Sequence, residues 1–320
     1  MRRRARPGLT RVASMPSAFL AGAVLLTSAA LAGCAGVNGT ALPTAGASRS
    51  SAAASAGAGS GDSAGAAASG TPGVSRAGQH NGNVPLSTAA PSPTSTPQPL
   101  AGQVIALDPG HNGANWSHPA IINRLVNVVS ELKACDTAGA QTDAGYAEHA
   151  FTFDVAMRLS RLLRAEGATV VLTRHNDHGV GPCVTQRAAI GNRAHADAAI
   201  SIHADGGPPT GTGFEVIAPG RLAGAPDGPV IGRSGRLAVD IRNAYHRMTG
   251  EPYSDYVGAR GLDIRTDLGG LNLSTVPKVF IECGNMRNSA DTARLTSPRF
   301  RERIALALAA GFTAFLNRHP

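Results

Sequence analysis

Aromatic residues are scarce in this sequence: they make up 4% of the 320 residues, with a single tryptophan, whereas there are 39 glycines and 21 prolines. A chain with so few large apolar side chains and so much glycine and proline is not expected to fold along its whole length. We find no internal repeat. The hydrophobic content of 42% nevertheless suffices for the core of one or two ordinary domains. The composition therefore predicts a folded part and an unfolded part.

The sequence also lacks any DNA- or RNA-binding motif, although its formal net charge is +8. Five of its basic residues are arginines within the first eleven positions: Arg2, Arg3, Arg4, Arg6 and Arg11. Removing these five from the 29 basic residues leaves 24 against 21 acidic ones, a net charge of +3. A charge this small gives no reason to expect a nucleic-acid partner.

An apolar run over residues 18–31 follows the arginines and is shorter than the roughly 20 residues that a transmembrane helix needs. A basic segment followed by a short apolar one is typical of an export signal. The run ends in Leu31-Ala32-Gly33-Cys34, which resembles a bacterial lipobox, where cleavage precedes a cysteine that carries a diacylglycerol. We predict a lipoprotein-type signal peptide over residues 1–33 and a mature protein in the cell envelope. It would be anchored through Cys34 on the outer face of the cytoplasmic membrane, with no other membrane contact. The alternative is an ordinary secretory signal with an incidental cysteine.

Residues 34–98 consist mostly of Ala, Gly, Ser, Thr and Pro, with Arg49, Asp62 and Arg76 as the only full charges. This composition cannot bury enough apolar surface to offset the entropy of ordering, so we predict a disordered linker. Residues 99–320 alternate short apolar runs with helical periodicity. That pattern predicts a single three-layer α/β domain, with a mostly parallel twisted sheet flanked by helices.

The apolar pattern also locates the main elements. We predict strands over residues 104–107, 169–173, 199–202, 213–218 and 276–283, and helices over residues 148–165, 184–196, 230–248 and 298–317. In the first helix, Phe151, Val155, Leu159 and Leu162 fall on one face. Gly167 follows where a helix is expected to end.

Neither an HExxH motif nor a CxxC pair occurs, so a metal site would have to combine separated residues. His111 follows the first predicted strand, Glu148 opens the first predicted helix, and His203 ends the third predicted strand. Sites in open α/β sheets form outside the carboxyl ends of the strands. Two imidazoles and one carboxylate are a known ligand set of catalytic zinc, with a fourth position left for water. Each residue alone has a structural alternative: a loop histidine, a carboxylate at a helix N-terminus, or a core histidine.

Several separated motifs resemble one known family. They are Asp108-Pro109-Gly110-His111, the segment 172–177, Arg187 and Asn192 ahead of residues 200–204, and the late Pro277-Lys278-Val279-Phe280-Ile281-Glu282. In order and spacing they are similar to the type 3 zinc amidases, N-acetylmuramoyl-L-alanine amidases that act on peptidoglycan. The resemblance covers nearly all of residues 102–320. It implies that His111, Glu148 and His203 hold Zn²⁺, that Glu282 is the catalytic carboxylate, and that the substrate is peptidoglycan. We expect a monomer.

The sequence departs from this family pattern between the first two ligands. His111 and Glu148 lie farther apart than is usual in the family, which implies an insertion between them. Glu131, inside that insertion, is the alternative ligand. The strong helix that begins at Glu148 favours Glu148.

The cysteines suggest one disulfide. If Cys34 carries lipid, three cysteines remain, and exported proteins commonly pair two of them. Cys283 follows Glu282 on one strand, so the two side chains face opposite sides of the sheet and Cys283 is expected in the core. Cys135 and Cys183 are left, and we predict that they form a disulfide.

Other polar residues have structural interpretations. We expect Arg174, Asp177 and Arg187 to form an ion-pair network, and Asn288 to cap a helix. His149 follows Glu148 on a helix, so the two side chains point about 100° apart and do not easily share one ion. His118, His175 and His178 are further histidines able in principle to bind metal.

Two other functions remain open. A zinc peptidase or deacetylase on other cell-wall amides would use the same zinc and carboxylate. A non-catalytic wall-binding lipoprotein is the second alternative. The presence of all four proposed site residues argues against it, because a decayed enzyme usually loses at least one.

Overall fold

The structure, a computed structural model, describes residues 98–318. The predicted signal peptide (residues 1–33), Cys34 and all but the last residue of the predicted linker lie outside the described residues. The strands are β1 (Val104–Pro109), β2 (Leu125–Asn127), β3 (Leu132–Ala134), β4 (Thr169–Leu172), β5 (Ala198–Asp205), β6 (Glu215–Pro219), β7 (Leu262–Arg265) and β8 (Lys278–Asn285). The helices are α1 (Pro119–Ile122), α2 (Glu148–Ala165), α3 (Val184–Arg193), α4 (Ile231–Thr249), α5 (Gly269–Asn272), α6 (Ser289–Leu295) and α7 (Pro298–Arg318), with a 3-10 turn η1 (Asn115–Ser117).

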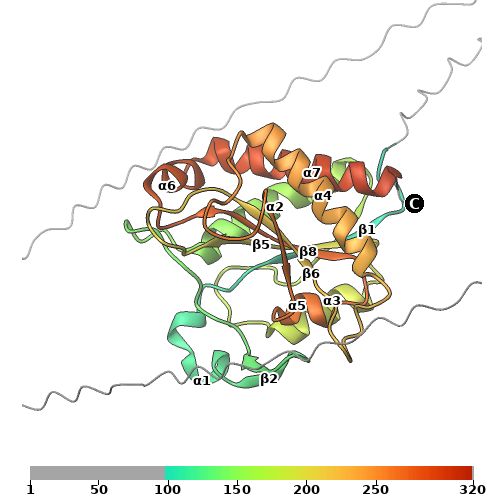
Figure 1. The fold of residues 1–320 in the computed structure, drawn as a ribbon, viewed down its shortest axis with the longest axis horizontal. Helices are drawn as coiled ribbons and strands as arrows, with labels where there is room; N and C mark the ends of the chain where they lie inside the picture. The colour runs from blue at the N-terminus through green and yellow to red at the C-terminus, as the bar shows by residue number, and fades with distance from the viewer. Residues whose placement is uncertain (1–97, 319–320) are drawn as a thin grey trace, which may run out of the picture. The chain divides into compact units, whose positions relative to one another are not determined.

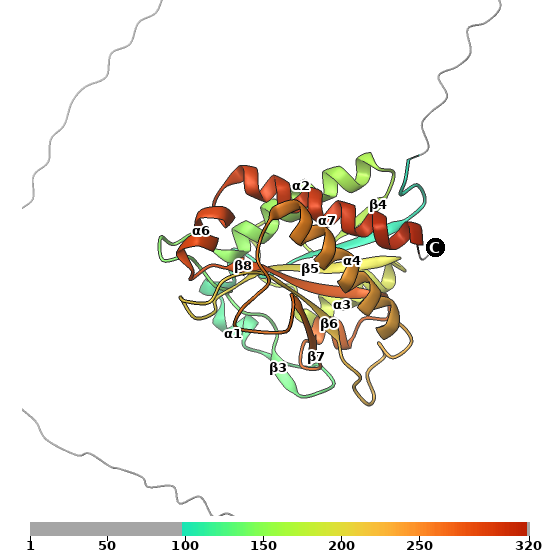
Figure 2. The ribbon, with the colours of Figure 1, turned by 45° about the horizontal axis from the view of Figure 1, so that its top comes forward.

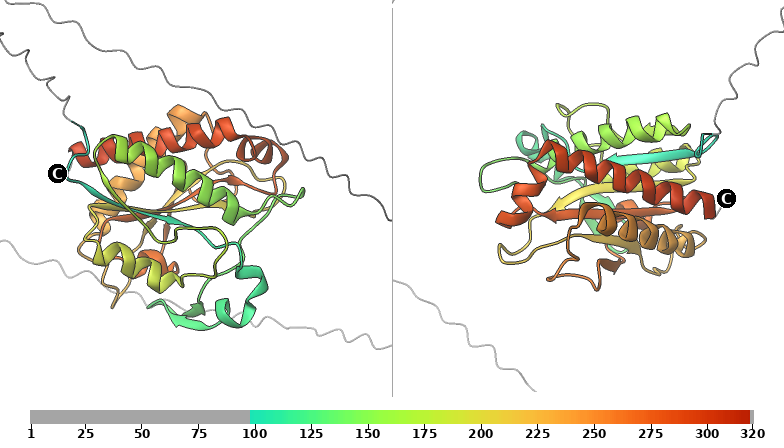
Figure 3. Two further views of the ribbon diagram at one scale, coloured as in Figure 1. Left: turned by 180° about the vertical axis from the view of Figure 1, so that it is seen from behind. Right: turned by 90° about the horizontal axis from the view of Figure 1, so that it is seen from above.

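Six strands form one twisted sheet in the order β4-β1-β5-β8-β6-β7. Neighbouring strands run parallel except β6 and β8, which are antiparallel. Helices α2, α4 and α7 cover one face of the sheet, and α3 and α5 lie on the other (Figures 1 and 3). This arrangement confirms the predicted three-layer α/β fold with a mostly parallel sheet.

The predicted apolar face of α2 is nearly right. Phe151, Val155 and Leu159 are fully buried in the main core, but Leu162 is only partly buried and Leu163 is buried instead. The helix ends at Ala165, close to Gly167, whose φ of +97° is one that glycine adopts without strain. Helix α2 is thereby fixed along the sheet with its N-terminus at the carboxyl ends of the strands.

Strands β5 and β8 separate apolar from polar side chains. On β5, Ile200 and Ile202 belong to the apolar core, so Ser201 and His203 face the opposite side. On β8, Cys283 is fully buried in that core, as predicted. The face of the sheet directed away from α2, α4 and α7 therefore carries the polar residues near the carboxyl ends of β5 and β8.

The predicted insertion between β1 and α2 carries short elements of its own. It contains η1, α1 and an antiparallel hairpin of β2 and β3. Figure 2 shows α1 and β3 beyond the sheet, on the side opposite to α2 and α7. The pattern analysis missed β2, β3 and β7 as well as the short helices α1 and α5. Within residues 98–318, no helix is both long and apolar enough to cross a membrane.

Candidate metal centre and active site

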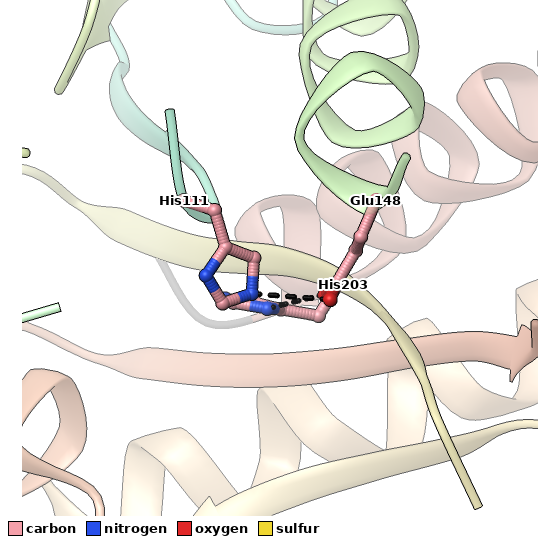
Figure 4. A group of neighbouring side chains, drawn as sticks. All are labelled: His111, Glu148 and His203. Carbon is pink, nitrogen blue, oxygen red and sulfur yellow. Dashed lines mark hydrogen bonds and ion pairs between the residues drawn. The ribbon is translucent and has the colours of Figure 1, made fainter. Parts of the chain in front are cut away.

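Three of the residues singled out in the sequence meet at one point. His111 follows β1, Glu148 is the first residue of α2, and His203 lies within β5. Their ligand atoms lie within 4.8 Å of one another. Nε2 of His111 is 3.1 Å from Oε2 of Glu148, and Nδ1 of His203 is 2.8 Å from Oε1 of the same carboxylate (Figure 4). The structure thus brings together the three predicted ligands from separate elements.

The backbone around His111 directs its imidazole toward the carboxylate. His111 has a φ of +58°, an uncommon value for a residue with a side chain. Its Nδ1 lies 3.0 Å from the carbonyl oxygen of Thr137, to which a protonated Nδ1 donates a hydrogen bond. Such a bond selects the tautomer whose Nε2 is free to bind a metal.

Two glycines allow the three side chains to approach so closely. At Gly110, an added Cβ would lie 2.1 Å from Cε1 of His203. At Gly139, with φ of +83°, it would lie 2.7 Å from Cδ2 of His111 and 2.9 Å from Oε2 of Glu148. Any larger residue at either position would displace a proposed ligand.

Glu148 is held as a carboxylate. It is 4% exposed, and it accepts hydrogen bonds from the backbone N–H of Ala140 at 2.7 Å and of Ala204 at 3.1 Å. Burial alone would raise the pKa of Glu148, but His111 and His203 hold that pKa well below its usual range. Its place at the N-terminus of α2 also favours negative charge.

The electrostatics of the cluster favour a positive charge at its centre. Burial opposes protonation of His111, but the carboxylates of Glu148 and Asp136 overcome it and raise the pKa of His111 to about 10. For His203 burial dominates and lowers the pKa. A divalent cation would take the place of the His111 proton, so metal binding at this group releases protons.

The chemistry of the donors fits one small divalent cation. Zinc bonds of about 2.0–2.2 Å in a tetrahedral set put neighbouring ligand atoms roughly 3.3 Å apart. The two atom pairs measured here, at 3.1 and 2.8 Å, are close to that spacing. Both imidazole rings are also held in place. Nδ1 of His111 bonds to the carbonyl oxygen of Thr137, and the His203 ring stacks on Phe280 with centroids 4.0 Å apart. The group can therefore hold a metal ion through the three predicted residues.

Glu282 lies beside this group. It is paired in register with His203 across β5 and β8, so both side chains are on the same face of the sheet. All four predicted site residues line one cavity of about 500 Å³. Among residues 98–318, Oε2 of Glu282 has no hydrogen-bond partner. Burial and then the carboxylates of Glu148 and Asp205 raise the pKa of Glu282 well above its usual range.

A buried charge network in the wall of the cavity supports the first strand. Asp108 accepts a hydrogen bond from Ser201 at 2.6 Å and forms ion pairs with Arg187 at 3.0 Å and Lys278 at 3.1 Å. Arg187 also donates to the carbonyl oxygen of His111 at 2.9 Å and pairs with Asp136 at 2.9 Å. Arg187 therefore belongs to an ion-pair network, as predicted, but its partners are Asp108 and Asp136, whereas Asp177 pairs with Arg174. The sequence analysis missed the contribution of Asp136, which lies in the insertion.

The remaining candidates lie outside the ligand group. Arg174 and Asp177 form the predicted ion pair at 2.9 Å, and Asp177 also binds Nδ1 of His149 at 2.8 Å. The alternative ligand Glu131 forms a surface pair with Lys133 at 3.8 Å. His118, His175 and His178 do not belong to the group either. Asn288 caps α6, as predicted, by accepting from the backbone of the first turn.

The predicted disulfide is confirmed. Cys135 and Cys183 are bonded, with their Cα atoms 4.4 Å apart. The bond joins the end of the β2–β3 hairpin to the residue before α3. It lies next to Asp136, which pairs with Arg187, so it fixes one wall of the cavity.

Replacing both Cys135 and Cys183 with Ser is expected to lower the free energy of unfolding by about 3 to 4 kcal/mol, because a closed loop of this length restricts the unfolded chain. The two cysteines are 48 residues apart. Urea unfolding of wild type and double variant measures the loss. Reductant should weaken the wild type to the same extent and leave the double variant unchanged. Equal stability of the oxidised wild type and the double variant would contradict the prediction.

The fold and the site together define a hydrolase of the α/β amidase class. Residues 105–314 match the N-acetylmuramoyl-L-alanine amidase family, and the chain belongs to this family. It is 41% identical over 228 residues to N-acetylmuramoyl-L-alanine amidase Rv3717 of Mycobacterium tuberculosis, covering 70% of this chain and 91% of that protein.

Solved structures give the same result. The crystal structure of the N-acetylmuramyl-L-alanine amidase Ami1 from Mycobacterium smegmatis is similar with a TM-score of 0.65 and 42% identity, over 69% of this chain and 99% of that one. The apo form of Ami1 from Mycobacterium abscessus is similar with a TM-score of 0.63 and 41% identity, over 68% of this chain and 100% of that one. The protein is therefore an enzyme of the amidase family.

Proposed function

We propose that the protein hydrolyses the amide between N-acetylmuramic acid and L-alanine of peptidoglycan, as a monomer, through the domain formed by residues 99–320. His111, Glu148 and His203 hold Zn²⁺, and Glu282 is the general base and then the general acid. The observation that carries the proposal is the meeting of these four residues in one cavity of a chain that belongs to the amidase family.

A bound zinc ion would supply an acidified water and polarise the amide carbonyl. The carboxylate of Glu282 takes a proton from the attacking water and passes it to the leaving nitrogen of L-alanine. Glu282 shares a face with His203 and has a free oxygen, which suits it to both transfers. The reaction needs no cysteine nucleophile, and Cys283 is fully buried in the core.

Product analysis tests this reaction directly. Purified peptidoglycan is digested and the soluble fragments are identified by mass spectrometry. Release of intact stem peptides with a free L-alanine amino terminus is the expected result. Shortened stems would instead indicate a zinc peptidase, free acetate a deacetylase, and binding without any product a non-catalytic wall-binding protein.

We also propose that the protein is exported and anchored through a lipid on Cys34. The support comes from the arginine-rich start, the apolar run over residues 18–31 and the Leu31–Cys34 motif. In Cys34→Ala, the acyl anchor should be lost and the protein should leave the membrane fraction. Fractionation and intact-mass analysis measure this. A wild-type protein that is already soluble and carries no lipid mass would contradict the anchor and leave the catalytic proposal standing.

A further inference from the structure

A third ionisable side chain continues the row formed by His203 and Glu282. Glu282 on β8 is paired in register with His203 on β5 and with Glu215 on β6. Val216, next to Glu215, belongs to the apolar core, so Glu215 faces the cavity side of the sheet. Directly opposed residues of antiparallel strands have Cβ atoms about 4.5–5.5 Å apart. Glu215 therefore stands next to Glu282, on the side away from His203.

Glu215 and Glu282 both have an unsatisfied oxygen. Glu215 is 3% exposed, and its Oε2, like the Oε2 of Glu282, finds no hydrogen-bond partner in the described part of the chain. Burial of a carboxyl oxygen without a partner is costly. One proton shared between two adjacent carboxyls would satisfy both, and it also removes the repulsion between two like charges.

We propose that Glu215 is a positioning residue for Glu282: its protonated carboxyl donates a hydrogen bond to the Glu282 carboxylate and holds it toward the proposed metal centre. This inference rests on the proposed function, in which Glu282 moves the proton. Glu215 itself touches neither metal nor substrate.

The surroundings of Glu215 raise its pKa, so that about half of it is still protonated at neutral pH. The groups that act on it come from three strands and the loop before β7: Asp205, Ser254, Tyr256, Asp263, Arg265 and Glu282. Burial is the largest effect, and together with the acidic neighbours it outweighs Ser254 and Arg265, so that the pKa of Glu215 is raised to about 7. Below that pH Glu215 can donate, and above it the donor is lost. The pKa of Glu282 is raised as well. A cation at the proposed metal centre would lower the pKa of Glu282 more than that of Glu215, because Glu282 lies between His203 and Glu215, and this leaves the shared proton on Glu215.

Two substitutions of Glu215 distinguish the effect of its hydrogen-bond donor from the effect of its ionisable carboxyl group. Glu215→Ala removes the donor, and kcat is expected to fall at least about tenfold, equal to about 1.4 kcal/mol of barrier, with little change in KM or metal content. Glu215→Gln keeps an N–H donor that does not titrate, so it should recover several-fold of that loss. Glu251→Gln is the matched control, because Glu251 is also buried, with a pKa raised to about 8, but pairs with Arg294 away from the cavity. Its kcat should stay near that of wild type.

The pH dependence of kcat separates the proposed hydrogen-bond donor from a purely structural role, because a structural role would not make kcat depend on the titration of Glu215. The ratio of Glu215→Gln to wild-type kcat cancels the titration of the shared groups that do not interact with Glu215. This ratio should rise as the pH passes through about 7, because only the wild type loses its donor there. A ratio that does not depend on pH, or a Glu215→Ala variant with unchanged kcat, would overturn the proposal.

Infrared spectroscopy tests the contact without any turnover. The difference spectrum between wild type and Glu215→Gln should contain the C=O band of the protonated Glu215 carboxyl, because the band of Glu251 is common to both proteins and cancels. This band should shift in Glu282→Gln, because its hydrogen-bond partner changes. If the position of this band is the same in wild type and Glu282→Gln, the two carboxyl groups are not in contact, whether or not the enzyme is active. A shifted band in a protein that releases no L-alanine-terminated peptides would instead refute the proposed function and leave the contact established.

Discussion

Glu282→Gln is expected to lower the rate of peptide release by 10²- to 10⁴-fold while metal content and fold stay as in wild type. The amide keeps nearly the size and shape of the carboxyl but cannot accept the proton of the attacking water. Loss of general acid–base catalysis typically has this size, about 3 to 5 kcal/mol of barrier. Kinetics of L-alanine-terminated peptide release and metal analysis of the same samples measure both quantities.

Glu251→Gln is again the control, because it makes the same chemical change at another buried glutamate, outside the cavity. It should bind metal and turn over like the wild type. Near-normal activity in Glu282→Gln would remove Glu282 from the mechanism. Loss of metal from that variant would make Glu282 a ligand, in place of a proton carrier.

Alternation of apolar and polar residues predicts the main strands and the face of the sheet that His203 and Glu282 take, whereas the choice of His111, Glu148 and His203 as proposed ligands depends on the family resemblance. In β5, Ile200 and Ile202 must face the core, which directs His203 to the opposite face. The same alternation in β8 separates Cys283 from Glu282. Parallel strands then bring the ends of β1 and β5 together, so separated residues meet at one edge of the sheet.

The elements that were missed lack such an apolar signal. Strands β2 and β3 have three residues each, and all are at least partly exposed. The hairpin depends on long-range contacts: the Cys135–Cys183 bond and the ion pair of Lys133 with Asp267 at 3.0 Å. Strand β7 is four residues long and has no fully buried position. Periodicity in a single sequence cannot report contacts of this kind.

Glu215 was missed for a different reason. In the sequence it is one charged residue inside an apolar strand, predicted over residues 213–218, and nothing nearby marks it. Its significance depends on the one antiparallel pairing of the sheet, which sets β6 beside β8 and Glu215 opposite Glu282. Sequence spacing predicts which face a side chain takes, but it does not predict the neighbouring strand.

Replacing His111 or His203 with Ala is expected to abolish both metal binding and turnover. Each change removes one of the three proposed protein ligands and leaves Glu148, buried and 4% exposed, without one of its imidazole partners. The loss of activity should reach at least the 10²- to 10⁴-fold expected for Glu282→Gln. Metal analysis after purification with equimolar Zn²⁺, followed by peptide release, measures both effects.

His149→Ala provides the decisive comparison, because His149 is also on the first turn of α2 but binds Asp177 and does not belong to the ligand group. It should keep its metal and most of its activity. Chelation of the wild type should reproduce the His111→Ala defect, and added Zn²⁺ should reverse it only where all three ligands remain. Stoichiometric zinc in both His111→Ala and His203→Ala would mean that other residues hold the metal. Loss of zinc from His149→Ala alone would move the site to the Asp177 side of the helix.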